Sequence, residues 1–412
     1  MTTLIYDIGI LVNVRKTHTL LYGKDLALLP CIHNAFLIVE DGIITDYGSM
    51  EDIPFQVTAF KQRYSAEGRC ILPSFCDSHT HLVFAGSRED EFVDKLKGLS
   101  YSEIAARGGG ILNSAKRLQE TSEELLFQQS FKRLQEVIAT GTGAIEIKSG
   151  YGLTVEDELK MLRVIRRLKQ NTSIPLRSTF LGAHAIPATY KEDKEAYIRL
   201  ILEEMLPRVG KEGLADYIDV FCEKGFYTPE ETIKICMAGK EFGLKPKIHA
   251  NQLNISGGVQ AGVKLNAVSV DHLEAMDEEA ISSLAGSKTI GTLLPTAAFF
   301  LRMPYQPARK LIDSNCAIAL ASDYNPGSSP SGNMNFVVAI SCIQMRMLPE
   351  EAINASTLNG AYAMELQDEV GSITKGKRAN LVMTVPVPSI QYLPYSFSNN
   401  LIEKVMVNGE FI

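Results

Sequence analysis

The sequence has few of the features that mark secreted or membrane proteins. Its seven cysteines are an odd number, lie far apart and form no Cys-x-x-Cys pair, which predicts reduced thiols rather than a framework of disulfide bonds. No apolar run approaches the roughly 18 uncharged residues of a membrane-spanning helix, and the N-terminus has no basic leader before an apolar run. We therefore expect a cytoplasmic protein with no membrane contact.

An excess of positive charge is also lacking. The 412 residues carry 41 Lys and Arg against 48 Asp and Glu, a formal net charge of -7. A surface that binds nucleic acid or anionic lipid needs clustered Lys and Arg, so this balance argues against both partners. It says nothing specific about a small-molecule substrate. With 45% hydrophobic and 22% charged residues, the composition is that of a globular protein with material for a large core.

Both ends of the sequence show the pattern of short β-strands separated by turns. Apolar runs at 10–14, 35–39 and 43–47 are separated by turn signals, among them Asp41-Gly42, a dipeptide that favours a tight hairpin turn. The same pattern returns at 379–385 and 401–407. We predict one small composite β-sandwich domain, formed by residues 1–66 and 366–412.

The middle of the chain alternates short β-rich runs with stretches of helical periodicity. Eight such runs occur, at 71–76, 144–147, 178–181, 217–221, 246–248, 267–270, 289–293 and 317–321. Helical patterns fill the intervals, and one of them starts at Thr228-Pro229, an N-cap followed by a first-turn proline. Eight strands that alternate with helices predict a (β/α)8 barrel, an α/β fold, over residues 67–365.

The most informative motif is His79-Thr80-His81, directly after the first run. Residues i and i+2 of a strand point to the same side, and neutral imidazole is the commonest metal-binding side chain. Such a pair can therefore hold one metal ion. A structural interpretation, in which one imidazole caps the strand and the other packs, stays open for this motif taken alone.

Further metal-capable residues follow the other predicted strands. They are His184, Glu223, His249, His272 and Asp323, so five of the seven histidines lie where the C-terminal ends of barrel strands form the catalytic face. A lone histidine at a strand end is commonly a satisfied polar cap, but the joint placement favours a site. Three imidazoles and a carboxylate suit zinc, and also iron or manganese. His18 and His33 lie in the β-rich leader, where we expect surface or capping roles.

The order of His79, His81, His249, His272 and Asp323 on such a barrel resembles the amidohydrolase superfamily over nearly the whole length. Four strings resemble more closely its branch that opens the imidazolone ring in histidine degradation. They are CDSHTHLVFAGSR at 76–88, EIKSGYG at 146–152, TFLGAHAIP at 179–187 and SDYNPG at 322–327. The resemblance implies a metal-dependent hydrolase that acts on a ring bearing a propionate.

The resemblance also implies the site residues. One zinc or iron ion would be held by His79, His81, His249 and Asp323. The substrate would be contacted by Arg88, Tyr151, His184, Gln252, Asn325, Gly327 and Ser328.

Roles for single residues follow from their chemistry. Arg88 offers a planar donor fork for a carboxylate, His272 is the candidate general base, and Asp323 can carry a proton to the leaving nitrogen. The resemblance implies that related sequences often have Glu at position 252. Gln252 has no useful titration, which moves proton transfer to His272 and Asp323. Tyr101 and Ser102, near the glycine run at 108–110, are expected to approach the ligand.

Several alternatives remain open at this point. An aminohydrolase that releases ammonia from a heterocycle would share the metal residues, and a barrel kept as a scaffold would share the fold. We expect one metal rather than two, although Glu223 and Lys148 are candidates to support a second. A homodimer is expected from the frequency of symmetric dimers.

Overall fold

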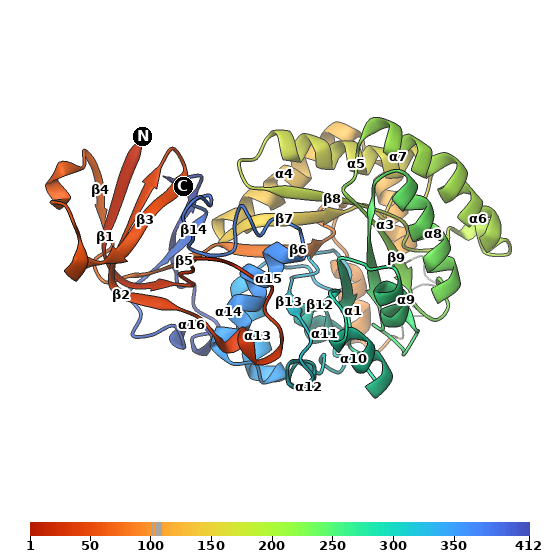
Figure 1. The fold of residues 1–412 in the computed structure, drawn as a ribbon. Helices are drawn as coiled ribbons and strands as arrows, with labels where there is room; N and C mark the ends of the chain where they lie inside the picture. The colour runs from red at the N-terminus through yellow and green to blue at the C-terminus, as the bar shows by residue number, and fades with distance from the viewer. Residues whose placement is uncertain (100–102, 104–108) are drawn as a thin grey trace.

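The computed structural model describes residues 1–99, 103 and 109–412, which form two eight-stranded sheets (Figure 1). One sheet is entirely parallel, and its strands follow one another in chain order. They are β6 (Phe75–Thr80), β7 (Thr142–Lys148), β8 (Leu176–Ala183), β9 (Tyr217–Cys222), β10 (Lys245–Ala250), β11 (Ser269–His272), β12 (Ile290–Leu293) and β13 (Ile318–Leu320). A parallel bridge between Thr80 and Tyr324 joins the first strand to the segment after the last. The predicted barrel is confirmed.

Helices connect these strands and pack around them. They are α1 (Glu89–Leu96), α3 (Ile111–Glu120), α4 (Glu123–Ala139), α5 (Val155–Gln170), α6 (Lys194–Leu200), α7 (Leu206–Glu212), α8 (Pro229–Glu241), α9 (Gly258–Lys264), α10 (Glu278–Ala285), α11 (Pro295–Leu301), α12 (Ala308–Asp313), α13 (Met334–Met345), α14 (Pro349–Ser356) and α15 (Leu358–Tyr362). A π-helical segment, η5 (Ile201–Met205), joins α6 to α7, and a short 3-10 turn, η4 (Ala188–Tyr190), precedes α6.

Local sequence explains where these helices begin. The predicted cap at Thr228 is confirmed: its hydroxyl accepts from the amide of Glu231, whose carboxylate accepts from the amide of Thr228, the reciprocal arrangement of a capping box. Apolar faces of the helices and both flanks of the strands form one large buried core. Among the described residues, no helix is long and apolar enough to cross a membrane.

The second sheet is mixed and combines both ends of the chain. Its strands are β1 (Thr2–Val12), β2 (Cys31–Glu40), β3 (Ile43–Ser49), β4 (Gln62–Ser65), β5 (Cys70–Pro73), β14 (Leu381–Thr384), β15 (Ile402–Val407) and β16 (Glu410–Phe411). The order is β16-β15-β14-β5-β1-β2-β3, with β4 paired to β1. Short helical turns η1 (Gly23–Ala27), η2 (Met50–Asp52), η3 (Val57–Ala59) and α16 (Tyr392–Tyr395) flank it. Asp41 and Gly42 turn β2 into β3 with positive φ angles of 48° and 83°.

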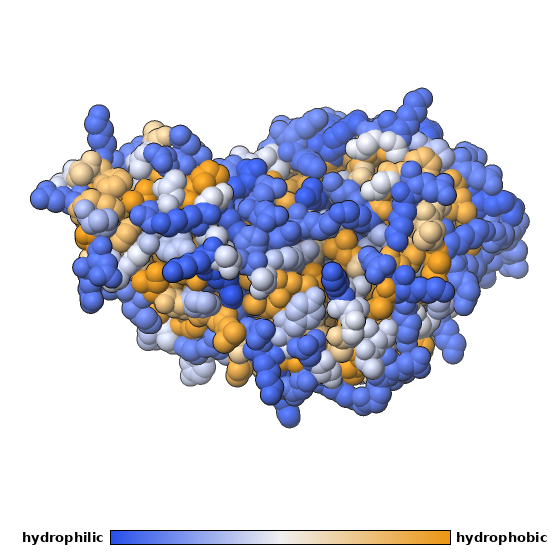
Figure 2. Space-filling model, viewed as in Figure 1, coloured by the Kyte–Doolittle hydropathy of each residue, from blue (hydrophilic) through white to orange (hydrophobic). Residues whose placement is uncertain are grey.

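Hydrophilic and apolar residues are both exposed on the face of the molecule that Figure 2 shows. Hydrophilic residues cover the outer helices around α6 and α7, whereas apolar residues show through over the mixed sheet (Figure 2). The termini meet at this sheet, because β1 and β14 both pair with β5.

One predicted strand divides in the structure. Of the run at 71–76, the part up to Pro73 belongs to the mixed sheet, and the barrel strand starts only at Phe75. Ser74 marks the change: its amide and its hydroxyl both donate to the carbonyl oxygen of Asn380. An unbroken apolar run carries no signal for such a switch between sheets. We propose that the boundary between the two domains follows Pro73 rather than residue 66.

Candidate metal centre

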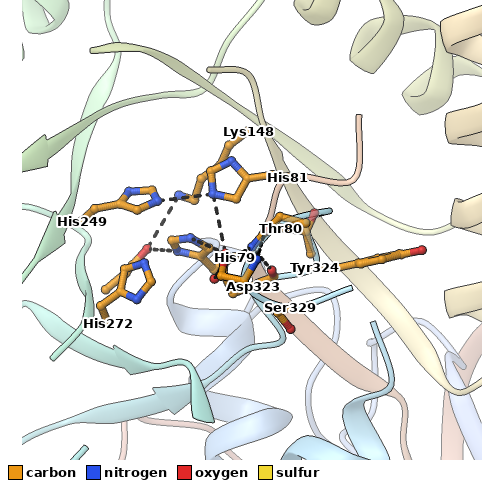
Figure 3. A network of polar contacts seen from close by, with 12 residues as sticks. His79, Thr80, His81, Lys148, His249, His272, Asp323, Tyr324 and Ser329 are labelled. Atoms are coloured by element: carbon orange, nitrogen blue, oxygen red, sulfur yellow. Dashed lines mark hydrogen bonds and ion pairs between the residues drawn. The ribbon is translucent and has the colours of Figure 1, made fainter. Parts of the chain in front are cut away.

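Five of the predicted residues converge at the C-terminal end of the barrel (Figure 3). His79 and His81 come from β6 and its end, His249 from β10, His272 from the end of β11 and Asp323 from the segment after β13. The Nε2 atoms of His81 and His249 are 3.3 Å apart, and Asp323 Oδ1 is 3.6 Å and 3.7 Å from Nε2 of His79 and His81. All five side chains are buried.

The junction that closes the barrel fixes three of these residues. The amide of Asp323 donates to the carbonyl of His79 at 3.0 Å, and the amide of His81 donates to the carbonyl of Tyr324 at 2.9 Å. Asp323 and His272 both have positive φ angles, 52° and 89°. Backbone strain of this kind persists where the surrounding structure enforces it, and it is concentrated at functional sites.

Two buried carboxylates orient two of the imidazoles. Nδ1 of His79 lies 2.6 Å from Asp271 Oδ2, and Nδ1 of His249 lies 2.9 Å from Asp219 Oδ2. A carboxylate accepts, so each Nδ1 carries the hydrogen and each Nε2 presents its lone pair to the centre. Burial keeps the pKa of His79 well below its ordinary value, and the neutral ring is the form that binds a metal.

The donor set fits a divalent ion. His79 Nε2 is buried and has no hydrogen-bond partner among the described residues, and an unpaired buried acceptor is costly unless a ligand uses it. Three imidazole nitrogens and one carboxylate oxygen match the preferences of zinc and of iron. Other triplets of nearby donor atoms combine His79 and His249 with His272, or His81 and His249 with His184. The cluster therefore has the donor atoms, and the spacing, that a metal site requires.

A fully buried lysine connects the two orienting carboxylates. Lys148 Nζ lies 2.9 Å from Asp219 Oδ2, 3.6 Å from Asp271 Oδ2 and 2.6 Å from Glu146 Oε1. Although burial opposes ionisation, His249 and Lys148 hold the pKa of Asp219 well below its ordinary value. Lys148 therefore offsets the cost of burying the two carboxylates that orient His79 and His249.

The buried acidic residues beneath the site, which contact Lys148, were not predicted from the sequence. Glu146 and Asp219 each stand between apolar residues of a buried strand, and Asp271 stands between Val270 and His272 in another. A charged residue in a fully buried strand is rarely tolerated without a partner. The position of these acidic residues within apolar strands could therefore have indicated buried ion pairs.

A cavity of about 1210 Å³ opens above the cluster. Its lining includes every predicted metal and substrate residue except His79, which lies beneath: His81, Arg88, Tyr151, His184, His249, Gln252, His272, Asp323, Asn325, Gly327 and Ser328. Tyr101, Ser102 and part of the glycine run at 108–110 lie outside the described residues. The side chains that were predicted from the sequence therefore line one cavity.

Two of the lining residues, Tyr151 and His184, lie against the ring of His81. The ring of His184 stacks on that of His81 at a centroid separation of 5.2 Å, and its Nδ1 lies 3.0 Å from the carbonyl oxygen of Gly150. Burial, with a contribution from His249, lowers the pKa of His184 to about 3, so this ring is neutral. The Tyr151 ring lies 5.5 Å from that of His184, and burial raises the pKa of its hydroxyl.

The cationic end of the cavity is at the start of α1. Arg88 donates from Nε and Nη2 to Glu91 Oε2 at 2.9 Å and 2.5 Å, which leaves Nη1 for a ligand. A Cβ atom on Gly327 would lie 2.2 Å from that Nη1, so only glycine leaves room for the guanidinium. Lys95, which the sequence analysis missed, also lines the cavity and donates to the carbonyl of Gly327 at 3.2 Å.

The turn after Asp323 is held by its own side chains. Asn325 Oδ1 accepts from the amides of Gly327 and Ser328, both at 2.8 Å, and its Nδ2 donates to Asp323 O and Ser328 Oγ. All four hydrogen-bonding positions of this amide are thus used within the turn. Ser328 Oγ in turn donates to Asp323 Oδ2 at 3.1 Å.

His272 has its own carboxylate. Its Nδ1 lies 3.4 Å from Glu274 Oε1, which also accepts from Gln306 Nε2 at 2.9 Å. Burial opposes protonation of this ring, but Glu274 and Asp323 outweigh it and raise the pKa of His272. The pKa of His272 is thus shifted in the opposite direction to that of His184.

Glu223, His18 and His33 were also considered from the sequence, and none of them lines the cavity. Glu223 accepts from the amides of Lys224 and Leu253, both at 2.9 Å, and so supports the loop that carries Gln252. His18 lies near the Tyr362 hydroxyl and Asp368, and His33 is exposed, as expected for residues outside the site.

Comparisons with known proteins give the family. The amidohydrolase family model matches residues 70–412. The imidazolonepropionases of Flavobacterium johnsoniae and Christiangramia forsetii are 57% and 55% identical, each over the full length of both chains. The imidazolonepropionase of Clostridium tetani is 43% identical over 95% of this chain and 93% of its own.

Solved structures show the same fold at low identity. A triazine hydrolase variant aligns with a TM-score of 0.77 at 12% identity, over 100% of this chain and 94% of its own. Guanine deaminase of Escherichia coli aligns at 0.73 and 14%, over 100% and 99%. A mutant atrazine chlorohydrolase of Arthrobacter aurescens, complexed with zinc and atraton, aligns at 0.73 and 12%, over 99% and 94%. Full-length identity above 50% is the decisive comparison: the chain belongs to the amidohydrolase family and, within it, to the imidazolonepropionases.

Proposed function

We propose that His79, His81, His249 and Asp323 hold one zinc or iron ion, and that the chain uses this centre to hydrolyse 4-imidazolone-5-propanoate to N-formimidoyl-L-glutamate. The observation that carries the proposal is the convergence of inward-facing Nε2 atoms and Asp323 Oδ1 beneath a cavity with Arg88 at its edge. The chemistry that such an ion supplies is the acidification of water, toward a pKa of about 7, and the polarisation of a carbonyl oxygen.

His272 is the proposed general base. Its Nδ1 is engaged by Glu274, which leaves Nε2 to take a proton from the attacking water. The water oxygen forms a bond to the ring carbonyl carbon, and the bond between that carbon and the ring nitrogen breaks. The new carboxylate becomes part of the glutamate product.

Asp323 is proposed to take the second proton, from the hydroxyl that the water has added to the carbonyl carbon, while the proton on His272 is released to solvent. One oxygen, Oδ1, faces His79 and His81, and the other, Oδ2, accepts from Ser328. Burial raises the pKa of this carboxyl, a property that suits a group that takes up and releases a proton. The departing ring nitrogen would receive that proton as the bond breaks.

Arg88 and Lys95 are proposed to bind the propionate. Both line the cavity on the side of Gly327, and Glu91 fixes the orientation of the guanidinium. Tyr151 and His184 would hold the ring above the metal ligands. Asn325 would act through the turn that it organises, with Gly327 and Ser328 in contact with the ligand. Gln252 can donate to or accept from the ring but cannot carry a proton.

The second candidate activity is deamination. The likeness to guanine deaminase, at 14% identity, concerns the fold alone. An assay for released ammonia separates the two reactions, since opening of the imidazolone ring releases none.

We further propose a homodimer in a reducing compartment. Symmetric dimers are the commonest oligomers, and light scattering on a sizing column would measure the mass. All seven cysteines are free, and five of them are buried, as in proteins of the cytoplasm.

The proposed activity is tested by the absorbance of freshly prepared imidazolonepropionate. We expect the absorbance to fall when the protein is added, and the fall to stop after dialysis against a chelator and to return with zinc or iron. Turnover that persists after complete removal of metal would contradict the proposal. Ammonia among the products would favour the second candidate.

A further inference from the structure

A buried carboxylate at the start of α5 is the starting point. Glu158 has no exposed surface and contacts the segment that precedes its own helix. Its Oε1 accepts from the amides of Gly152 at 2.7 Å and Leu153 at 3.1 Å, and its Oε2 accepts from the amide of Gly150 at 3.1 Å. Three backbone donors thus surround one side chain, with Tyr151 in the middle of them.

The backbone that Glu158 holds has little freedom. Gly150 and Leu153 have φ angles of +115° and +57°. A Cβ atom on Gly152 would lie 2.3 Å from the amide nitrogen of Glu158, and one on Gly150 would lie 2.8 Å from His184 Nδ1. We name residues 150–153 the Tyr151 loop. It passes against the helix on one side and against His184 on the other, so a shift of its backbone moves both neighbours.

This loop determines two of the groups that face the substrate. Tyr151 is only 3% exposed, and its ring lies 5.8 Å from that of His81. The Gly150 carbonyl can only accept, so His184 Nδ1 donates to it and Nε2 keeps its lone pair. The loop therefore places the Tyr151 ring and selects the tautomer of His184.

We propose that Glu158 is a positioning residue for substrate binding, which acts through the backbone of the Tyr151 loop on Tyr151 and His184. This inference rests on the proposed function, because it takes both side chains to contact the substrate. Glu158 itself does not line the cavity. Its effect must therefore appear in the affinity for substrate and not in the metal content.

The test is the kinetics of Glu158→Gln beside a matched control. The glutamine keeps the volume but turns an NH2 group toward a loop amide, so at least one buried N–H loses its acceptor. We expect KM to rise about tenfold, kcat to fall less than threefold and the metal content to stay at the wild-type value. Glu156→Gln, two residues away on the same helix and paired with Arg208 at the surface, should leave all three unchanged.

A double variant shows whether Glu158 acts through Tyr151. Tyr151→Phe should raise KM by itself, and Tyr151→Phe with Glu158→Gln should raise it by less than the product of the single effects. Multiplicative effects, or a wild-type KM in Glu158→Gln, would overturn the inference while Tyr151 keeps its role. A wild-type KM in Tyr151→Phe would overturn the substrate contact itself, which is the failure of the proposed function at this residue.

A milder variant guards against failure to fold. Glu158→Asp keeps the charge and shortens the reach by one methylene, so we expect a smaller rise in KM than for the glutamine variant, again without loss of metal. Loss of metal in parallel with the rise in KM would indicate a general collapse of the barrel mouth and would overturn the positioning role.

Discussion

At the scale of single residues, the sequence was a good guide to side chains that face the cavity and a poor guide to those that hold them. His79, His81, His249 and Asp323 lie in the last residues of barrel strands or just after them, and a parallel barrel brings these strand ends together. Glu91 and Glu274 fix Arg88 and His272 through contacts three and two residues away. Nothing in the sequence around them distinguishes them from surface acids, because only the fold determines their burial.

His272 is the residue whose role is most readily tested. Replacement by alanine should lower kcat by a factor of roughly 10² to 10⁴, the usual contribution of a general base, and leave one metal per chain. Steady-state kinetics with elemental analysis measures both quantities, and His33→Ala, at an exposed position, is the matched control. Near-normal kcat would refute the base role, and loss of metal would make His272 a ligand.

Gly327 is predicted to matter through Arg88. Gly327→Ala places a methyl group where the guanidinium lies, so the fork must move away from the propionate. We expect KM to rise by roughly 10- to 100-fold, since hydrogen bonds to charged groups contribute about 1.5–3 kcal/mol. Gly286→Ala, where the nearest atom is 3.8 Å away, serves as the control. An unchanged KM would show that the propionate binds elsewhere.

At the scale of elements, periodicity located seven of the eight barrel strands and only the start of β6, and it could not show which strands are connected by buried ion pairs. The pairing of β7 with β9 and β11 through Lys148, Asp219 and Asp271 depends on the curvature of the closed barrel. For the same reason the switch from β5 to β6 at Ser74 escaped the sequence. It depends on Asn380, which lies about 300 residues further along the chain.

Lys148 should affect metal affinity without any contact to the metal. Lys148→Met leaves Asp219 and Asp271 without their shared cation, so His79 and His249 lose fixed orientation. We expect the dissociation constant for zinc to rise 10- to 100-fold, as for other groups that orient ligands, in a competition assay with a chromophoric chelator. Lys247→Met is the control, because Lys247 is equally buried and shares Glu146 with Lys148, but its other hydrogen bonds go to the carbonyls of Ser78 and Ala363 rather than to Asp219 or Asp271. Equal weakening in both variants would contradict a specific role.

Glu158 also makes stability depend on pH. Burial, partly offset by hydrogen bonds from Ser149 and the loop amides, raises its pKa to about 6. A raised folded-state pKa means that the contribution to stability is complete below about pH 4.5 and is lost as the pH rises through about 6. Between pH 4.5 and pH 7, the free energy of unfolding of the wild type should therefore fall by up to about 2 kcal/mol relative to that of Glu158→Gln. Denaturant titrations of both proteins at pH 4.5 and pH 7 measure these free energies. The same difference between the two proteins at both pH values would refute the prediction.

At the scale of the whole molecule, the mixed sheet and the barrel are connected tightly. β5 passes directly into β6, and the Asn380 amide donates to the carbonyl of Gly143 at 2.9 Å. The sequence of the two ends predicted a β domain, but not that β5 would lead straight into the strand that carries His79. We infer that the mixed sheet supports the start of the strand that carries His79.

Metal should therefore stabilise the entire protein. Binding to the folded state alone adds about 4 kcal/mol when the free ion is 1,000-fold above its dissociation constant. Calorimetry should show one unfolding transition that moves to lower temperature on addition of a chelator. Two separate transitions, with only one of them sensitive to metal, would show that the mixed sheet and the barrel unfold independently.

The central claim is the identity of the four ligands, and anomalous diffraction at the zinc edge tests it most directly. For crystals of the zinc-loaded protein, we expect one peak per chain within bonding distance of Nε2 of His79, His81 and His249 and of Oδ1 of Asp323. A peak that His184 coordinates, a second peak of equal height, or no peak at this end of the barrel would contradict the account.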